Sequence, residues 1–403
     1  MRDSWKETTL GSISEVIGGG TPPTAISEYW NGSIVWLTPT EITSQDGKVV
    51  SNSLRKITDS GFRNSGAQML PKGSVILTSR ASIGFVAISG IALCTNQGFQ
   101  SLIPNESLVA KFLMFWIQQN RSEFESRSAG STFKEISKSN VKSMKILLPT
   151  IPEQKRIVDL ISSVDAYVEA LQQQLECAKK SRNAVLHELL TTGGDDWVES
   201  NLGSIAKWSG GITPSMANLE FWTDGTIPWI SSGDIATYER QGTKKCVSRK
   251  ALSDSSLKLL PIGTIILVVR SGILIHSLPV AILREPACIN QDIKSAQVNE
   301  NVVPEFLWMY LRFMEKEILS TCRKTGTTVQ SISTDALLGM TINVPPLAQQ
   351  KSIIEIISTV DEIANRTERV INQAQNLRSG LLSDLLSGDH EIPASYDKLM
   401  DIA

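Results

Sequence analysis

The chain has 403 residues, of which 41% are hydrophobic and 20% charged, and its formal net charge at pH 7 is −2. This length allows two to four domains with sizeable cores, and no apolar run reaches the roughly 18 residues of a membrane-spanning helix. The polar start, Met1–Leu10, argues against a secretory signal. Five scattered cysteines without C-x-x-C spacing argue against disulfides or a zinc site and favour a reducing cytoplasm.

Residues 1–148 predict a mixed α+β module that carries a small surplus of positive charge. They hold 15 Lys and Arg against 11 Asp and Glu, although the net charge of the whole chain does not suggest a nucleic-acid partner. The β-rich segment Ser74–Thr78 follows a Pro-x-Gly turn signal, which is typical of a buried strand. Phe112–Gln119 is typical of a short helix, and the tryptophans beside alternating apolar positions indicate core anchors.

From residue 149 to residue 192 the pattern changes to apolar residues spaced alternately by four and three. This period predicts a long helix with a coiled-coil seam. Pro152 suits the first turn of the helix and Gly193 its end. The 39 residues from Pro152 to Leu190 would span ~58 Å. The predicted seam comprises Ile157, Ile161, Val164, Val168, Leu171, Leu175, Ala178, Val185 and Leu189, interrupted by Arg182.

Residues 193–343 repeat the first module. The offset between matching residues drifts only from 190 to 196, so the chain is a tandem duplication. The predicted strand recurs at Thr264–Val269 and the short helix at Phe306–Phe313. The matches are Trp5 with Trp197, Leu10 with Leu202, Thr21 with Thr213, Trp36 with Trp229, Leu70 with Leu260, Arg80 with Arg270, Asn96-Gln97 with Asn290-Gln291, and Arg127 with Arg323.

Residues 344–390 repeat the long helix at a constant offset of 196, and residues 391–403 form a tail. We expect the two helices to pair antiparallel as a coiled coil, with the modules related by a pseudo-two-fold axis. Arg182 and Arg378 interrupt both seams at the same register, and we expect each to meet the start of the opposite helix, where Glu153 lies. Docking of a partner is the alternative role for these arginines. The second seam comprises Ile353, Ile357, Val360, Ala364, Thr367, Ile371, Ala374, Leu381 and Leu385.

No motif predicts catalysis by the chain itself. Glu153-Gln154-Lys155 resembles the end of a nuclease metal site, but it lacks the strand and upstream Asp that such a site needs. Val344-Pro345-Pro346-Leu347 lacks the polar and aromatic residues of an amino-methyltransferase motif. Gly18-Gly19-Gly20 lacks the Lys-Ser/Thr of a phosphate-binding loop, and three distant histidines do not indicate a metal site or a triad.

The order module, helix, module, helix resembles the specificity subunits of Type I restriction-modification enzymes across nearly the whole chain. The motifs that carry the resemblance are the opening Leu10–Trp36, Leu70-Pro71-x-Gly73, and the helix entries Pro149–Ile157 and Pro345–Ile353. The resemblance implies two target-recognition domains, each reading half of an asymmetric bipartite site in double-stranded DNA. It also implies that the helices dock two methyltransferase subunits, that a motor-endonuclease subunit can join, and that S-adenosylmethionine, ATP and Mg²⁺ bind those partners.

Candidate DNA contacts are cations beside short polar residues. The matching loops suit phosphate binding, because they combine a charged fork with glycine and hydroxyl groups, although a solvated loop is equally compatible. Arg80 and Arg270 end equivalent strands and could contact DNA or form structural salt bridges. A basic cluster is peculiar to the second copy. The loop candidates are Arg127, Ser131, Thr132, Lys134, Arg323, Lys324, Thr327 and Thr328, and the cluster is Lys244, Lys245, Arg249 and Lys250.

Two other functions compete with this interpretation. An enzyme that acts alone would bind S-adenosylmethionine or a metal, and the missing motifs argue against it. An adaptor would bind protein, or stack single-stranded RNA on exposed aromatic rings. The tryptophans recur at core-like positions in both copies, which argues against exposed stacking platforms.

Overall fold

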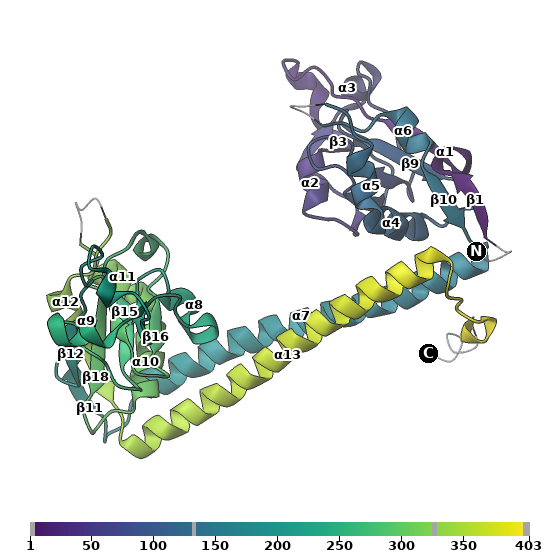
Figure 1. Ribbon diagram of the computed structural model, residues 1–403. Helices are drawn as coiled ribbons and strands as arrows, with labels where there is room; N and C mark the ends of the chain where they lie inside the picture. Colours follow the sequence, from purple (N-terminus) through teal and green to yellow (C-terminus); the bar gives the residue numbers. More distant parts are fainter. Residues whose placement is uncertain (1–4, 131–133, 325–328, 398–403) are drawn as a thin grey trace. The chain divides into compact units, whose positions relative to one another are not determined.

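The computed structural model describes residues 5–130, 134–324 and 329–397, and the chain divides into two compact units. Unit 1 comprises residues 1–172 and 369–403, and unit 2 comprises residues 173–368. Each unit therefore holds one module and a stretch of both long helices (Figure 1). We refer to residues 1–148 as module 1 and to residues 193–343 as module 2.

Module 1 is built on a five-stranded sheet in the order β2-β9-β6-β7-β4, with a three-stranded sheet, β5-β3-β8, beside it. A separate pair, β1 with β10, joins the two ends of the module. Its strands are β1 Lys6–Thr9, β2 Ser14–Gly18, β3 Trp30–Leu37, β4 Val49–Val50, β5 Arg55–Ile57, β6 Val75–Leu77, β7 Val86–Ser89, β8 Cys94–Thr95, β9 Gln100–Pro104 and β10 Lys145–Leu148. Its helices are α1 Leu10–Ile13, α2 Pro39–Thr43, α3 Asp59–Arg63, α4 Ala110–Gln119, α5 Arg121–Ser126, α6 Lys138–Lys142 and the 3-10 turn η1 Ser27–Tyr29.

Module 2 repeats this plan with the sheets β12-β18-β15-β16 and β14-β13-β17 and the closing pair β11-β19. The fifth strand of the large sheet is replaced by helix α8, which packs against β16. Its strands are β11 Val198–Asn201, β12 Ala206–Gly210, β13 Ile227–Ile230, β14 Cys246–Val247, β15 Ile265–Val268, β16 Val280–Ile282, β17 Cys288–Ile289, β18 Ile293–Val298 and β19 Thr341–Val344. Its helices are α8 Ile235–Gln241, α9 Arg249–Asp254, α10 Pro304–Phe313, α11 Glu315–Thr321, α12 Thr334–Gly339 and the turns η2 Leu219–Phe221 and η3 Gly272–Ile275.

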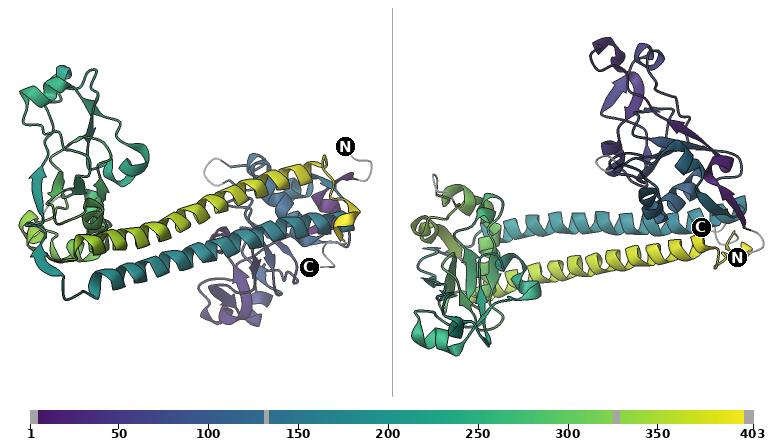
Figure 2. Two further views of the ribbon diagram at one scale, coloured as in Figure 1. Left: turned by 90° about the horizontal axis from the view of Figure 1, so that it is seen from below. Right: turned by 45° about the horizontal axis from the view of Figure 1, so that its top comes forward.

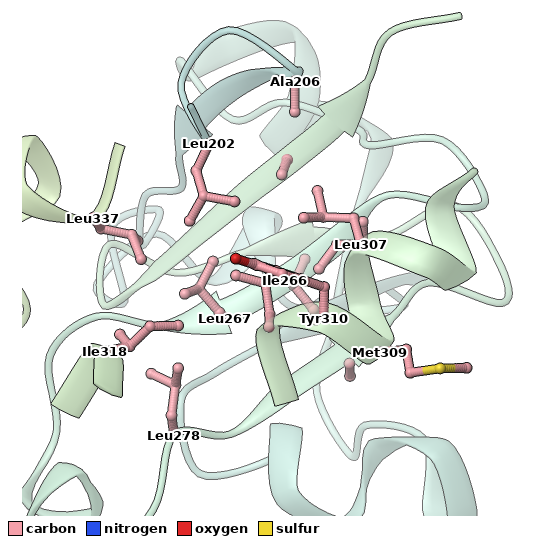
Figure 3. Packing of buried hydrophobic residues seen from close by; sticks show 14 of the residues in the cluster. Leu202, Ala206, Ile266, Leu267, Leu278, Leu307, Met309, Tyr310, Ile318 and Leu337 are labelled. Carbon is pink, nitrogen blue, oxygen red and sulfur yellow. The ribbon is translucent and has the colours of Figure 1, made fainter. Parts of the chain in front are cut away.

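The predicted strands and short helices lie at the centre of each core. β6 and β15 are buried along their whole length, because the sheet is covered on both faces. Figure 3 shows Ile266 and Leu267 of β15 gathered with Leu307 and Tyr310 of α10 in the apolar cluster of module 2. The predicted mixed α+β modules, each followed by a long helix, are confirmed.

The two long helices are α7, Ile151–Thr191, and α13, Leu347–Ser387, each of 41 residues. Gly193 and Gly388 follow their ends with φ of +71° and +79°, a left-handed conformation that glycine adopts without a steric penalty. The helices lie side by side within each unit in both views of Figure 2. The tail adds a short turn, η4 Ala394–Tyr396, to unit 1.

An ion pair joins the two helices, which run antiparallel in the ribbon (Figure 1), within each unit. In unit 1, Arg378 of α13 forms an ion pair with both carboxylate oxygens of Asp165 of α7, and the Arg378 Nη2 lies 3.2 Å from the Asp165 Oδ2. In unit 2, Arg182 of α7 holds Asp361 of α13, with Nε to Oδ1 at 2.5 Å and Nη2 to Oδ2 at 3.0 Å. The two pairs are equivalent under the offset of 196 residues.

The partner that we expected for Arg378 was wrong. Glu153, in the first turn of α7, instead accepts a hydrogen bond of 3.0 Å from Nε1 of Trp5. The arginine meets the helix several turns further on, at Asp165, because the overlap of the two helices brings Arg378 opposite this acid. Internal pairing therefore accounts for both seam arginines.

The predicted seam is buried most completely near the helix starts. Val185 departs from the prediction: it is 38% exposed, whereas Leu186 and Leu190 are buried against module 2. An α-helix with 3.6 residues per turn drifts from a period of 3.5, so its buried stripe rotates along its length. Buried seam residues are Ile157, Ile161, Val168, Leu175, Ile353, Ile357, Ile371, Ala374 and Leu385, and half-buried ones are Val164, Leu171, Ala178, Leu189, Val360, Ala364, Thr367 and Leu381.

A buried glutamine fixes each long helix to its module. The Gln154 side chain has no exposed surface. Its Oε1 accepts a hydrogen bond from the Val109 N–H at 2.8 Å, and its Nε2 donates to the Ser107 and Pro149 carbonyls at 3.0 Å each. One side chain thus joins the loop before α4 to the segment that enters α7.

Gln350 repeats the same three bonds in unit 2. It accepts from Val303 N–H at 2.8 Å and donates to the carbonyls of Asn301 and Pro345 at 2.8 and 2.7 Å. The helix-entry motif Pro-x-x-x-x-Gln therefore has a structural role, because its glutamine satisfies buried backbone groups that would otherwise lack partners.

Candidate nucleic-acid interface

In module 1, three segments of the chain meet just past the end of β6, the central strand of the five-stranded sheet. Past β6, the Ser79 N–H bonds the Gly98 carbonyl at 2.8 Å, and the Ile136 N–H bonds the Ser79 carbonyl at 3.0 Å. Arg80 bridges to Glu135 both through the backbone and through an ion pair of 2.9 Å. The loop that begins at Arg127 therefore folds back beside Arg80.

The opening loop of module 1 joins the same place. Thr21 Oγ1 donates a hydrogen bond to Gln97 Oε1, next to the Gly98 carbonyl. Gly19 explains how the loop packs so closely, because a Cβ there would lie 2.0 Å from the Asn96 carbonyl oxygen. The glycine triplet thus serves close backbone packing. We call the surface formed by Thr21, Arg80, Gln97, Arg127 and Glu135 the polar edge of module 1.

Module 2 builds an equivalent polar edge from Thr213, Arg270, Gln291 and Arg323. Thr213 Oγ1 donates to Gln291 Oε1 at 2.5 Å, and Arg270 Nε lies 3.0 Å from Asp292 Oδ1. The loop that begins at Arg323 folds back as in module 1, since the Ser271 N–H bonds the Gln330 carbonyl and the Ile332 N–H bonds the Val269 carbonyl. Retained residues that are far apart in the sequence therefore gather at one place in each copy.

Several of the predicted contact residues form ion pairs with carboxylates of the same module. Arg80 and Arg270 form the salt bridges that we weighed as an alternative, and they remain 46% and 60% exposed. Arg127 pairs with Glu123 at 2.6 Å, four residues earlier on α5. Lys134, Arg323 and Lys324 are exposed on the same loops, and Ser131, Thr132, Thr327 and Thr328 lie outside the described residues.

The predicted basic cluster lies around β14 and the start of α9. Lys244, Lys245, Arg249 and Lys250 are all exposed. Lys250 Nζ lies 2.5 Å from Glu220 Oε2, and this hydrogen bond to a carboxylate raises the pKa of the Lys250 ammonium. At one end of the cluster Glu220 thus partly neutralises the charge of Lys250, whereas at the other end the exposed Lys244 and Lys245 can contact an anion.

Sequence reasoning missed Arg55, which is the module 1 counterpart of one member of the basic cluster, Lys245. In module 1 the register of β3 and β5 places Arg55 opposite Trp36, while in module 2 the Trp229 N–H bonds the Lys245 carbonyl at 2.9 Å. Arg55 therefore occupies the position of Lys245. The stretch between Trp36 and Leu70 diverges too far between copies for sequence matching to align these cations.

Exposed apolar residues recur at equivalent positions of the two long helices. Tyr167 on α7 is 54% exposed, and Ile363, its equivalent on α13, is 53% exposed. Leu377, beside the seam arginine of unit 1, is 58% exposed. Tyr167 and Ile363 are related by the offset of 196 residues, so the two units expose matching apolar side chains.

The buried thiols are unsuited to nucleophilic chemistry. Burial raises the pKa of the Cys94 thiol to about 11 and that of the Cys288 thiol to about 12, so both stay protonated near neutral pH. Within residues 5–130, 134–324 and 329–397, no group of three or more His, Cys, Asp or Glu is placed to hold a metal ion. In the same residues, no helix combines the length and apolar character needed to cross a bilayer.

Comparison with known families matches both halves of the chain to one description, Type I restriction modification DNA specificity domain, at residues 2–178 and 194–376. The Type I restriction enzyme MjaIX specificity subunit of Methanocaldococcus jannaschii is 28% identical over 411 residues, which cover 96% of this chain and 93% of that protein. The Type I restriction enzyme EcoR124I/EcoR124II specificity subunit of Escherichia coli is 34% identical over 269 residues, 65% of each chain.

Solved structures share the fold. A Type I restriction-modification S subunit from M. genitalium superposes with a TM-score of 0.55 at 16% identity, covering 95% of this chain and 96% of that one. A chain from a structure on complex assembly and conformational transition of the type I R-M system reaches 0.63 at 16% identity, covering 97% and 99%.

Proposed function

The chain belongs to the Type I restriction modification DNA specificity family, and on that premise we propose that each of its modules reads one half of an asymmetric bipartite site in duplex DNA. The chain is then the specificity subunit, and methylation and cleavage are carried out by partner subunits. The observation that carries this proposal is the polar edge, which recurs in both modules with the same threonine–glutamine pair and the same strand-end arginine.

The residues of the polar edge that are the same in both modules suit contacts with the DNA backbone, and those that differ between the modules suit the reading of bases. Phosphates are the same at every position of a duplex, so residues that contact them can be kept between copies. Bases differ between the two half-sites, so residues that read them must differ. The loop after the strand-end arginine differs between the polar edges: Arg80 is followed by a short turn, whereas Arg270 is followed by the longer η3 segment with Ile275 54% exposed.

The long helices suit a fixed spacing between half-sites. A helix of 41 residues is about 60 Å long, and duplex DNA presents the same groove about every 34 Å. α7 connects module 1 to module 2 along the chain, so its length sets a limit on how the two half-sites are spaced. A base-paired gap of constant length between two short half-sites follows from this arrangement.

We propose further that the outer faces of α7 and α13 dock two methyltransferase subunits. Tyr167 in unit 1 and Ile363 in unit 2 support this stoichiometry, because each unit offers an exposed apolar residue at the equivalent position. The methyltransferase subunits would bring S-adenosylmethionine for adenine methylation, and a motor-endonuclease subunit would add ATP-driven cleavage. The complex would work in the cytoplasm of a bacterium or archaeon, where the chromosome lies.

Binding to duplex DNA over a series of salt concentrations tests the proposal. The chain is purified with its methyltransferase subunit and titrated with fluorescent duplexes that carry or lack the methylated site. We expect preference for the site at all salt concentrations and a linear fall of log K with log salt. Equal affinity for both duplexes would reject specific reading, and binding that does not depend on salt would favour a protein adaptor.

A further inference from the structure

Both modules contain a tryptophan pair of the same geometry, and in each a cation lies over at least one ring of the pair. In module 1 the rings of Trp30 and Trp36 meet edge to face with centroids 5.1 Å apart and an interplanar angle of 84°. The Arg55 guanidinium carbon lies 3.7 Å from the Trp30 ring centroid and 5.4 Å from that of Trp36. The planar guanidinium thus covers the apolar pair and presents its donors to solvent.

Module 2 repeats the arrangement with a lysine. Trp222 and Trp229 meet with centroids 5.1 Å apart and an interplanar angle of 86°. Lys245 Nζ lies 5.8 Å from the Trp229 ring centroid. The copies therefore retain the positive charge and its platform, whereas the residue type has changed.

The same buried tryptophan connects each cation to the polar edge. Trp36 Nε1 donates a hydrogen bond of 2.9 Å to the Gly20 carbonyl, and the next residue is Thr21, which holds Gln97. The cation and the threonine–glutamine pair are therefore joined through one rigid side chain, only 2% exposed.

In module 2 the connection is the same. Trp229 Nε1 donates at 3.1 Å to the Ile212 carbonyl, directly before Thr213, which holds Gln291. Trp229 is also buried, at 4% exposure, so a rigid side chain joins the Lys245 backbone to the polar edge as Trp36 does in module 1.

Arg55 and Lys245 differ in their charge balance from three arginines of the polar edges. Arg80, Arg127 and Arg270 each hold a carboxylate. Over the described stretches of the chain, neither Arg55 nor Lys245 forms an ion pair, and both side chains are exposed. An exposed cation without a carboxylate has its full charge available for an external anion.

We propose that Arg55 and Lys245 are equivalent phosphate-binding residues that fix the register of each module on the duplex. A phosphate requires a positive charge at a given place and accepts either an arginine or a lysine. Reading a base through paired donors depends on the planar fork of arginine more strictly than binding a phosphate does. The two copies keep a positive charge at this position but differ in the shape of the side chain, which indicates contact with the DNA backbone. This inference rests on the proposed DNA-reading function.

The test measures binding of the complex of the full chain with its methyltransferase subunit to two duplexes, one with the methylated site and one with that site scrambled. The variants are Arg55→Gln, Arg55→Lys and Lys245→Gln. Lys72→Gln is the matched control, because Lys72 is exposed in the turn that precedes β6, at the end of the strand opposite Arg80. The unfolding midpoint of each variant is recorded in parallel.

We expect Arg55→Gln and Lys245→Gln each to weaken binding to both duplexes by the same factor. Each should reduce the slope of log K against log salt by about 0.9, the value for one phosphate contact. Arg55→Lys should keep the slope, and Lys72→Gln should change nothing.

Two results would overturn the inference. One is an unchanged salt slope for both glutamine variants, and the other is a loss confined to the duplex with the site, which would assign base reading instead. If the unsubstituted complex does not distinguish the two duplexes, the proposed function itself fails. A drop in midpoint shared by Arg55→Lys and Arg55→Gln, with binding unaltered, would assign Arg55 a purely structural role.

Discussion

Replacing Gln154 by Met should destabilise unit 1 by about 3 kcal/mol. Met has a similar shape but cannot form the three hydrogen bonds that the amide makes to Val109, Ser107 and Pro149. A buried backbone group left without a partner costs about 1–3 kcal/mol. The lower figure applies to each of these three, since local adjustment at the start of a helix can recover part of the loss.

For a unit of about 200 residues this change corresponds to a fall in Tm of about 6–12 °C. Calorimetry of the full chain measures it, and hydrogen exchange identifies the unit that responds. Gln154→Met should increase exchange in α4, whereas Gln350→Met, which removes the equivalent bonds in unit 2, should increase exchange in α10. Gln173→Met, at an exposed position of α7, is the control and should stay within about 0.5 kcal/mol. An unchanged Tm for Gln154→Met would refute the assigned role of the motif glutamine.

The remaining predictions concern the helix pair, a buried thiol and the tail. Replacing Arg182 or Asp361 by Ala should lower the free energy of unfolding of unit 2 by about 0.5–1 kcal/mol, measured by urea titration. The double variant should lose less stability than the sum of the two single variants, and strict additivity would contradict the ion pair. Iodoacetamide at pH 8 should label the exposed Cys177 and spare Cys94, because burial raises the pKa of the Cys94 thiol to about 11. Peptide mass spectrometry measures the labelling of both cysteines, and equal labelling would refute the burial of Cys94. Because the unfolded thiol ionises first, this raised pKa also makes stability fall as pH rises from about 9 to 11. Ile392→Ala should destabilise unit 1 by about 2–3 kcal/mol, because its side chain is buried in the module 1 cluster, and unaltered hydrogen exchange around it would count against that packing.

The parts of the fold that follow from local pattern were predicted correctly from the sequence. Ser74–Thr78 and Thr264–Val269 contain β6 and β15, because a short apolar run between turn signals fits a buried strand. The end of α7 near Gly193 followed from the need for a left-handed residue after a helix. Each of these predictions depends only on neighbours in the chain.

Features that depend on pairing between distant segments were missed. The partner of Arg378 depends on how far the antiparallel helices overlap, and the period of the seam does not contain that information. The exposure of Val185 depends on where the helix leaves its partner and packs against module 2. Both are set by tertiary packing.

The polar edge was predicted in part. Arg80 and Arg127 were singled out because they recur between copies, but their carboxylate partners, Glu135 and Glu123, become evident only once the loop folds back. Arg55 carried no signal in the sequence, because its register against Trp36 is set by a strand pairing inside the most diverged stretch of the repeat.

Mapping of methylated adenines tests the central claim most directly. The chain is expressed with its methyltransferase subunit in a host free of other adenine methylation. It is compared with a variant in which a second copy of residues 1–148 replaces residues 193–343. The account predicts an asymmetric site of two short half-sites at a fixed gap, and, for the variant, a site in which the first half-site occurs twice. Absence of methylation, or a site that the exchange leaves unchanged, would contradict the assignment of one half-site to each module.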